Sequence, residues 1–305
     1  INEPLPEKVD VLIYGPSKPV VDNGFSADFV LHKFENQRDL GRISPEVAVR
    51  IRGIAVTGLV QADAAMLAKF PKTEIVSSFG VGYDHIDFKY AAGHNIIVTN
   101  TPDVLTETTA DFGFALMMAT ARRMAESEHY LRRGEWTRWS YDMFTGSDVH
   151  GATLGILGMG RIGQGIARRG ALGFGMPVIY HNRSRLDPAV EAQLGARYVA
   201  KDELLRQADH LVLVLPYSPQ SHHAIGAAEL ALMKPTATLT NVARGGIVDD
   251  AALARALRER RIAAAGLDVF EGEPAVHAEL LQLPNVVLTP HIASASLPTR
   301  LAMAQ

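Results

Sequence analysis

Three residues able to donate protons or bind anions each follow a short apolar segment in the second half of the chain: Arg244, Glu273 and His291. The segments are Ala237–Val242, Ala263–Phe270 and Asn285–Thr289. A histidine can donate a proton near neutral pH, and a nearby carboxylate favours its protonated form. A guanidinium grips a carboxylate with its planar fork and polarises a ketone. Each residue alone is typical of an ordinary structural role, but together they suit hydride reduction of a 2-oxo acid.

A glycine-rich motif, G-x-G-x-x-G, follows the apolar segment Leu154–Leu157 and opens a helical pattern. It consists of Gly158, Met159, Gly160, Arg161, Ile162 and Gly163. In this context the first glycine allows a tight turn, the second lets backbone amides approach a pyrophosphate, and the third packs helix against strand. Amides at the helix N-terminus then hold the diphosphate. The motif predicts a dinucleotide site; the alternative is a glycine-rich turn that binds nothing.

The residues at the end of the next apolar segment, Pro177–Asn182, indicate whether the cofactor is NAD(H) or NADP(H). NAD enzymes place an acidic residue there to bind the ribose 2′-hydroxyl. This chain has Asn182, Arg183, Ser184 and Arg185, with no acid until Asp187. Two arginines and a serine would attract a 2′-phosphate through charge-assisted hydrogen bonds. We therefore expect NADP(H), with NAD(H) as the alternative if both arginines are solvated surface charges.

The elements that must position these residues alternate between strand and helix. In the first third, β-branched runs predict strands and the intervening stretches predict short helices, which implies a mostly parallel sheet. The strands are Val9–Gly15, Phe29–Phe34, Ile51–Gly58, Glu74–Phe79 and Asn95–Asn100, and the helices include Ala62–Phe70 and His85–Ala92.

Thr106–Arg133 is rich in Ala, Leu and Met and predicts one long helix or two in tandem. The polar and aromatic segment Gly134–His150 predicts a loop that joins it to the second domain.

Six strands with helical crossovers follow, which fits a doubly wound dinucleotide-binding sheet. The strands are Thr153–Leu157, Pro177–Asn182, His210–Pro216, Ala237–Val242, Ala263–Phe270 and Asn285–Thr289. The helices are Arg161–Leu172, Asp187–Leu194, Lys201–Gln207, Ala227–Lys234 and Asp249–Glu259. The tail after Pro290 is expected to return to the first domain. We therefore predict an α/β protein with a discontinuous substrate domain, 1–101 plus 291–305, and a dinucleotide-binding domain, 102–290.

Composition narrows the function classes. The chain has 305 residues, no cysteine and a net charge of −3. Disulfides and thiolate metal sites are excluded, and a cytoplasmic location is expected. The interspersed charges argue against nucleic-acid binding, and no apolar run reaches the ~20 residues that a membrane span needs. We expect no metal site, because His222 and His223 are adjacent rather than at helical spacing.

At this point the chain resembles the D-isomer-specific 2-hydroxyacid dehydrogenase family. The resemblance covers nearly the whole chain and rests on four signatures and a histidine segment. They are Val76–Asp87, Leu154–Gly163, Asn241–Asp249, Gly266–Pro274 and Thr289–Ser294.

The resemblance implies two Rossmann-like or flavodoxin-like domains with the active site in a cleft between them, D-stereochemistry, and a homodimer formed through the cofactor domain. It makes Arg244, Glu273 and His291 the catalytic triad. The backbone amides of Val81 and Gly82 would bind the substrate carboxylate. The remaining cofactor contacts would be Thr109, Leu215, Pro216, Val242, Asp268, His291 and Ser294.

Within the family, the chain is most similar to glyoxylate/hydroxypyruvate reductases. The basic segment resembles theirs, and Trp139 falls where a tryptophan of the partner subunit is expected to cap the site; a buried loop anchor is the alternative. Formate dehydrogenases of this superfamily carry Gln where Glu273 stands. A larger aromatic 2-oxo acid remains an alternative substrate, with Leu59, Met143 and Phe144 shaping an apolar pocket. A non-catalytic, dinucleotide-sensing protein of the same fold is the alternative of another class.

Overall fold

The computed structural model describes residues 8–17, 19–57 and 60–305. The chain forms two compact units, Ile1–Leu105 with Ala295–Gln305, and Thr106–Ser294. We expected the chain to pass from one domain to the other after residues 101 and 290. It passes between the two units after Leu105 and after Ser294. His291 therefore belongs to the same unit as Arg244 and Glu273.

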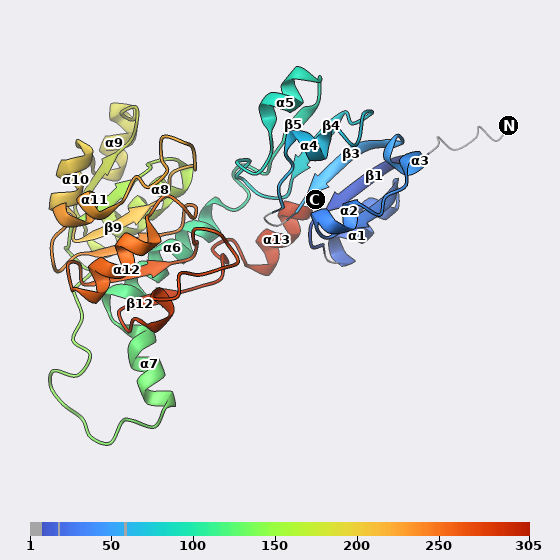
Figure 1. Ribbon diagram of the computed structural model, residues 1–305. Helices are drawn as coiled ribbons and strands as arrows, with labels where there is room; N and C mark the ends of the chain where they lie inside the picture. The colour runs from blue at the N-terminus through green and yellow to red at the C-terminus, as the bar shows by residue number, and fades with distance from the viewer. Residues whose placement is uncertain (1–7, 18, 58–59) are drawn as a thin grey trace. The chain divides into compact units, whose positions relative to one another are not determined.

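The first unit contains a five-stranded parallel sheet in the order β2-β1-β3-β4-β5. The strands are β1 (Val9–Tyr14), β2 (Phe29–Phe34), β3 (Ile51–Val56), β4 (Ile75–Ser78) and β5 (Ile97–Thr99). The helices are α1 (Pro19–Ser26), α2 (Gln37–Leu40), α3 (Pro45–Ala48), α4 (Ala64–Leu67), α5 (Phe88–Gly93) and the C-terminal α13 (Leu297–Ala304). α13 packs against α1 (Figure 1). α2 and α3 lie in a stretch between strands where short helices were expected, and they are single turns whose N-termini are capped by Asn36 and Ser44.

The second unit contains a seven-stranded parallel sheet in the order β12-β11-β10-β9-β6-β7-β8. The strands are β6 (Leu154–Leu157), β7 (Val178–His181), β8 (Ala196–Tyr198), β9 (His210–Leu213), β10 (Thr238–Asn241), β11 (Ala264–Leu267) and β12 (Val286–Leu288). The two parallel-sheet α/β units confirm the predicted fold class. The predicted count of six strands was wrong, because β8 is a short edge strand without an apolar run.

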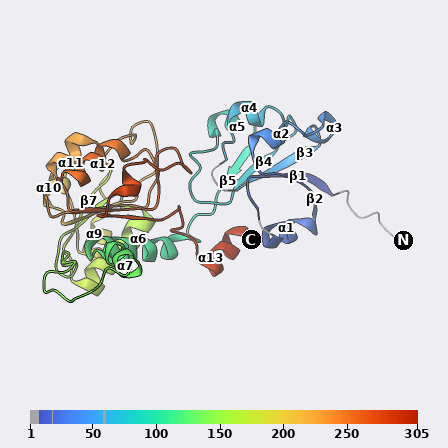
Figure 2. The same cartoon turned by 60° about the horizontal axis from the view of Figure 1, so that its bottom comes forward.

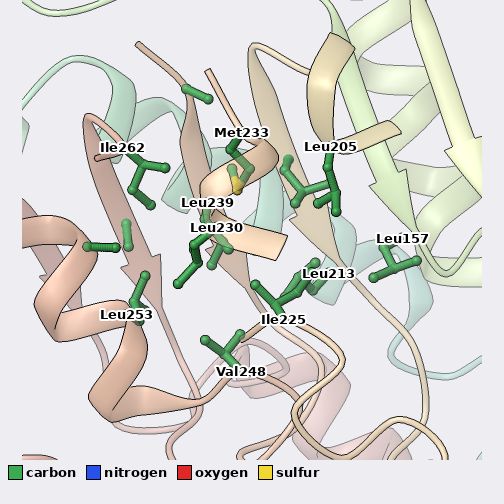
Figure 3. Packing of buried hydrophobic residues seen from close by; sticks show 14 of the residues in the cluster. Leu157, Leu205, Leu213, Ile225, Leu230, Met233, Leu239, Val248, Leu253 and Ile262 are labelled. Carbon is green, nitrogen blue, oxygen red and sulfur yellow. The ribbon is translucent and has the colours of Figure 1, made fainter. Parts of the chain in front are cut away.

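Helices cover both faces of this sheet (Figures 1 and 2). They are α6 (Thr106–Ala121), α8 (Arg161–Arg168), α9 (Pro188–Leu194), α10 (Lys201–Gln207), α11 (Ala227–Leu232) and α12 (Asp250–Arg258), whereas α7 (Met124–Arg132) extends beyond the edge strand β12 (Figure 1). Two apolar clusters hold the layers together. In one of them, Leu205 of α10 and Leu253 of α12 pack in the same core as Leu239 of β10 (Figure 3). β6, β9, β10 and β11 are buried along their whole length, as expected for central parallel strands.

Two predicted helical segments are divided in the structure. Thr106–Arg133, expected as one long helix or two in tandem, forms the two helices α6 and α7, which are separated at Arg123 with its left-handed φ of 54°. The segment Arg161–Leu172 ends in a π-helical turn, Arg169–Gly173, where a Cβ on Gly170 would come within 2.6 Å of Leu154 Cδ2. Among the described residues, no helix is long and apolar enough to cross a membrane.

Candidate active site

The last residues of six neighbouring strands lie in register across the sheet of the second unit. They are His181, Leu157, Leu213, Asn241, Leu267 and Leu288. This row marks the carboxyl edge, where open α/β sheets bind their ligands. Gly158, Asn182, Arg244, Asp268 and His291 follow it within three residues. The fold therefore brings these predicted residues to one edge.

His291 and Glu273 form a hydrogen-bonded pair at this edge. His291 Nδ1 lies 2.8 Å from Glu273 Oε2, and Glu273 Oε1 accepts a bond of 2.9 Å from the backbone N–H of Phe270. The Glu273 side chain is 13% exposed and that of His291 is 32% exposed. The carboxylate is thus fixed, and because it engages Nδ1, Nε2 is the ring nitrogen available for proton transfer to a substrate.

Asp268 holds the turn that carries His291. We expected this residue inside a strand, but β11 ends at Leu267 and Asp268 follows it, fully buried. Its Oδ1 accepts bonds from Thr289 Oγ1 (2.6 Å) and the N–H of Ile292 (2.9 Å), and its Oδ2 accepts from the N–H of Ala293 (2.9 Å). The carboxylate thus organises residues 289–293, including the left-handed backbone of His291 at φ 53°. Asp268 acts here as a positioning residue, a role that the sequence did not predict.

Arg244 lies on the neighbouring loop, whose shape is set by Asn241. Asn241 Oδ1 accepts from the N–H of Ala243 (3.0 Å), and Asn241 Nδ2 donates to the carbonyl of Arg244 (3.2 Å). A Cβ on Gly245 would lie 1.8 Å from the carbonyl oxygen of Phe270, so the two loops are in direct contact. Because the N–H of Phe270 also donates to Glu273, the structure brings the loop of Arg244 against the loop that carries the His291–Glu273 pair.

The glycine-rich loop shows which glycines the fold itself requires. Gly158 has a φ of +101°, and its Cβ would come within 2.6 Å of the Val214 backbone. A Cβ on Gly163 would lie 2.4 Å from the carbonyl oxygen of Gly158. No described atom lies within 4 Å of a Cβ built on Gly160. The fold explains the first two glycines but not Gly160, which leaves open space at the helix N-terminus where a phosphate would approach.

Other observations around this loop fit a dinucleotide. α8 begins at Arg161, and its N-cap, Gly160, makes no side-chain capping hydrogen bond. The Thr109 hydroxyl is buried and has no hydrogen-bond partner among the described residues, so it can bond to a ligand. The remaining predicted contacts sit at the carboxyl edge: Leu215 and Pro216 after β9, Val242 after β10, and Ser294 after His291.

Asn182 has a structural contact as well as its predicted cofactor role. Its side-chain Oδ1 accepts a 2.7 Å hydrogen bond from the N–H of Met159, inside the glycine-rich loop. Asn182 therefore ties the end of β7 to that loop.

We expect Gly160→Ala to leave the melting temperature unchanged, because the added methyl group meets no described atom. The same substitution should weaken dinucleotide binding by about 10–100-fold, since a methyl group there obstructs close backbone approach. Gly163→Ala is the matched control and should lower the melting temperature. Thermal melts and cofactor titrations of both variants check this; a destabilised Gly160→Ala protein, or one that binds cofactor normally, would contradict it.

In the basic segment after β7, Arg185 is paired with a carboxylate, which the sequence did not predict. Arg185 donates to both carboxylate oxygens of Glu191 on α9, at 2.9 and 2.7 Å. Arg183 and Ser184 are exposed, and within the described part of the chain Arg183 has no ion pair. The sequence did not predict the contact between Arg185 and Glu191, because Glu191 lies on the following helix. Of the two arginines predicted to bind a 2′-phosphate, Arg183 is therefore the one that no described carboxylate already pairs with.

Glu191 is the centre of a small network. The Arg185 guanidinium, followed by the Tyr180 hydroxyl that donates to Glu191 Oε1 at 2.6 Å, holds the pKa of Glu191 below its ordinary value. Burial, followed by this same bond, raises the pKa of Tyr180 to about 12. Tyr180 also accepts from the N–H of Leu186 at 2.8 Å, so the network fixes the segment that follows Asn182.

Two of the predicted substrate residues of the first unit, Val81 and Gly82, lie in the loop after β4. The carbonyl of Val81 accepts from Asn100 Nδ2 at 2.8 Å, and that of Gly82 from Ser78 Oγ at 3.3 Å. These bonds use the carbonyls, so the loop is held without occupying the amides that we expect to bind a carboxylate. Leu59 lies outside the described residues.

The loop 134–150 of the second unit runs outward beyond α7 (Figure 1). Trp139 is 72% exposed on it, so within the single chain it is no buried anchor. Phe144 instead attaches the loop: its ring packs edge-on against Tyr130, and the Arg123 guanidinium lies over it at 5.2 Å. Phe144 is therefore engaged with α7, which weakens its predicted role in an apolar substrate pocket.

Comparisons with known proteins identify a family of dinucleotide-binding dehydrogenases, in agreement with the geometry of this sheet edge. A family profile described as "D-isomer specific 2-hydroxyacid dehydrogenase, NAD binding domain" matches residues 114–293. A glyoxylate reductase of Thermococcus onnurineus is 46% identical over 297 residues, which cover 95% of this chain and 88% of the relative. One of Korarchaeum cryptofilum is 51% identical over 245 residues, which cover 80% and 73%.

Solved structures give the same result. The NADPH-dependent glyoxylate/hydroxypyruvate reductase of Sinorhizobium meliloti, in complex with NADP and malonate, superposes with a TM-score of 0.88 at 39% identity, covering 98% of this chain and 91% of that one. The D-lactate dehydrogenase of Aquifex aeolicus, with NAD and lactic acid, gives 0.84 at 28% identity and covers 95% and 91%.

Proposed function

Because the chain belongs to the D-isomer specific 2-hydroxyacid dehydrogenase family, and is thus an oxidoreductase of 2-oxo and 2-hydroxy acids, we propose that it reduces glyoxylate or hydroxypyruvate with NADPH. The observation that carries the proposal is the His291–Glu273 pair, 2.8 Å long, at the same sheet edge as the glycine-rich loop and Arg244. In that arrangement a proton donor, an anion binder and a dinucleotide loop share one edge.

The nicotinamide dinucleotide, when bound, supplies the hydride that reduces the carbonyl carbon. His291 donates a proton from Nε2 to the carbonyl oxygen, and Glu273 stabilises the protonated imidazole and fixes its orientation. Arg244 binds the substrate carboxylate through its planar fork and polarises the ketone. The amides of Val81 and Gly82 give further donors to that carboxylate. Asp268 keeps the His291 turn in place.

The preference for NADPH rests on the end of β7. Neither acidic residue of this region is placed to repel a 2′-phosphate. Glu191 forms an ion pair with Arg185, and Asp187 caps α9 by accepting a hydrogen bond from the N–H of Ala189. Arg183 and Ser184 are exposed there. The relative from Sinorhizobium meliloti, whose structure holds NADP, gives independent support.

We expect Arg183→Gln to raise the KM for NADPH by about 10–100-fold, because a charge-assisted hydrogen bond to the 2′-phosphate is lost. The KM for NADH should change little. Arg185→Gln should have a smaller effect on NADPH, since Glu191 already compensates that guanidinium. Steady-state kinetics with both cofactors measure this, with Arg206→Gln as a control for general loss of positive charge. Equal losses for NADPH and NADH would rule out the phosphate-binding role.

A substrate panel tests the function itself. Oxidation of NADPH and NADH is followed with glyoxylate, hydroxypyruvate and hydroxyphenylpyruvate. Fastest turnover of the two small acids with NADPH supports the proposal, whereas fastest turnover of hydroxyphenylpyruvate would favour the aromatic alternative. Tight binding of dinucleotide without turnover of any 2-oxo acid would favour a dinucleotide-sensing protein.

We further propose that the chain forms a homodimer through its second unit. No residue of α7 is buried, and α7 and residues 280–288 line a groove of about 340 Å³. The adjoining loop exposes Trp136, Trp139 and Tyr141, an unusual amount of aromatic surface for a monomer. In the dimer, Trp139 would cap the partner's substrate site. Sedimentation equilibrium measures the mass of the assembly.

A further inference from the structure

A second cluster of polar side chains adjoins the loops that carry Arg244 and Glu273. One ring nitrogen each of His222 and His223 and one carboxylate oxygen of Glu271 all lie within 4.8 Å of one another. His223 Nε2 is 3.0 Å from Glu271 Oε2, and the two imidazole rings stack with centroids 3.9 Å apart. The reduction proposed above uses none of the three.

The backbone around this cluster is held by hydrogen bonds. His223 has a left-handed φ of 49°, and its N–H donates to the carbonyl of Gly246 at 2.7 Å. The N–H of Glu271 donates to Asp250 Oδ2 at 3.0 Å. The two segments that carry the imidazoles and the carboxylate are therefore fixed at the backbone, while the side chains of His222 and Glu271 are exposed and accessible to an ion.

Outer partners surround the two histidines. The Tyr217 hydroxyl lies 3.1 Å from His222 Nδ1, with its ring edge-on to the imidazole. Asp249 Oδ2 lies 3.9 Å from His223 Nδ1. Such hydroxyl and carboxylate neighbours orient metal-binding imidazoles and increase their basicity. The carboxylates of Asp249 and Glu271 also give the cluster negative charge, which attracts a cation.

The donor set decides the class of ion. Two imidazoles and one carboxylate form a known ligand set for zinc in sites that keep one position for water. Imidazole selects zinc, nickel and copper, whereas magnesium and calcium prefer all-oxygen sites. We propose that His222, His223 and Glu271 bind a divalent transition-metal ion of the zinc class. This goes beyond the proposed reductase activity and does not depend on it.

The sequence did not predict this site, because His222 and His223 are adjacent and the third ligand is distant. Glu271 lies 48 residues after His223, and only the parallel sheet brings it there. The site also has a consequence for the molecule. His223 is bonded to Gly246 in the arginine loop, and Glu271 is two residues before Glu273. An ion held by all three would therefore cross-link the two catalytic loops and stabilise the folded chain.

Calorimetric titration of the metal-stripped full chain with ZnCl₂ tests the proposal. We expect one equivalent of zinc to bind, and MgCl₂ at the same concentration to give no heat. His223→Gln and Glu271→Gln should each weaken zinc binding by at least about 10-fold, since each removes one ligand. His150→Gln, which removes another exposed histidine of the same unit, should bind zinc like the parent chain.

Thermal melting provides a second readout. Zinc should raise the melting temperature of the parent and of His150→Gln, but not that of the two ligand variants. Metal-free melts that match the parent show that the variants fold. A parent chain that takes up no zinc, or ligand variants that bind it as tightly as the parent, would overturn the proposal. Neither result bears on glyoxylate turnover, so the metal site and the reductase activity fail independently.

Discussion

Replacement of His291 by asparagine is expected to lower kcat for the reduction of glyoxylate by about 10²–10⁴-fold, the usual worth of a positioned general acid. The loss falls on kcat because the imidazole acts on the carbonyl oxygen in the transition state, whereas dinucleotide binding depends on the glycine-rich loop. Asparagine is the substitution of choice, since it tolerates the left-handed backbone at φ 53° better than alanine does. Stopped-flow and steady-state kinetics measure the change.

Two controls separate loss of the proton donor from loss of structure. The dissociation constant for NADPH, measured by fluorescence, and the melting temperature should stay close to those of the parent. Glu273→Gln keeps a hydrogen-bond partner for His291 Nδ1 but removes the negative charge. Its kcat should therefore lie between that of the parent and that of His291→Asn. Near-normal turnover of His291→Asn would remove His291 from the mechanism.

Asp268→Asn provides a contrasting case, because Asp268 acts through the backbone. Its two oxygens accept from Thr289 and from the N–H groups of Ile292 and Ala293. An amide cannot accept at both positions, so a buried donor is left unsatisfied. The role of Asp268 is thus one of position, which distinguishes it from the proton transfer that we propose for His291.

Sequence reasoning could bring residues to one sheet edge where they follow strands of a parallel sheet. Arg244, Glu273 and His291 follow β10, β11 and β12 within a few residues, and parallel strands end at one edge. That rule needs only the apolar runs and their order. It placed these residues together although no pairing between them can be read from the chain.

Contacts between side chains of different helices, strands and loops could not be predicted from the sequence in this way. The pairing of Arg185 with Glu191 and the meeting of His223 with Glu271 depend on how a helix or loop returns to the sheet. β8 was missed for another reason: Ala196–Tyr198 is a half-exposed edge strand, with no periodicity to detect. The sequence allowed two tandem helices in Thr106–Arg133 but did not locate the break at Arg123, because a left-handed residue other than glycine or asparagine has no marker in the sequence.

Replacement of Arg244 by glutamine is expected to lower kcat/KM for glyoxylate by about 10²–10³-fold, since two charge-assisted hydrogen bonds of ~1.5–3 kcal/mol each are lost or weakened. Arg244→Lys keeps the positive charge but not the planar fork, and should recover only part of that loss. The loop itself should survive both changes, because Asn241 holds it through the backbone of Ala243 and Arg244. NADPH affinity is the internal control. If Arg244→Lys equals the parent, the guanidinium acts as a simple charge; if Arg244→Gln equals the parent, the carboxylate is bound elsewhere, and the amides of Val81 and Gly82 become the first candidates.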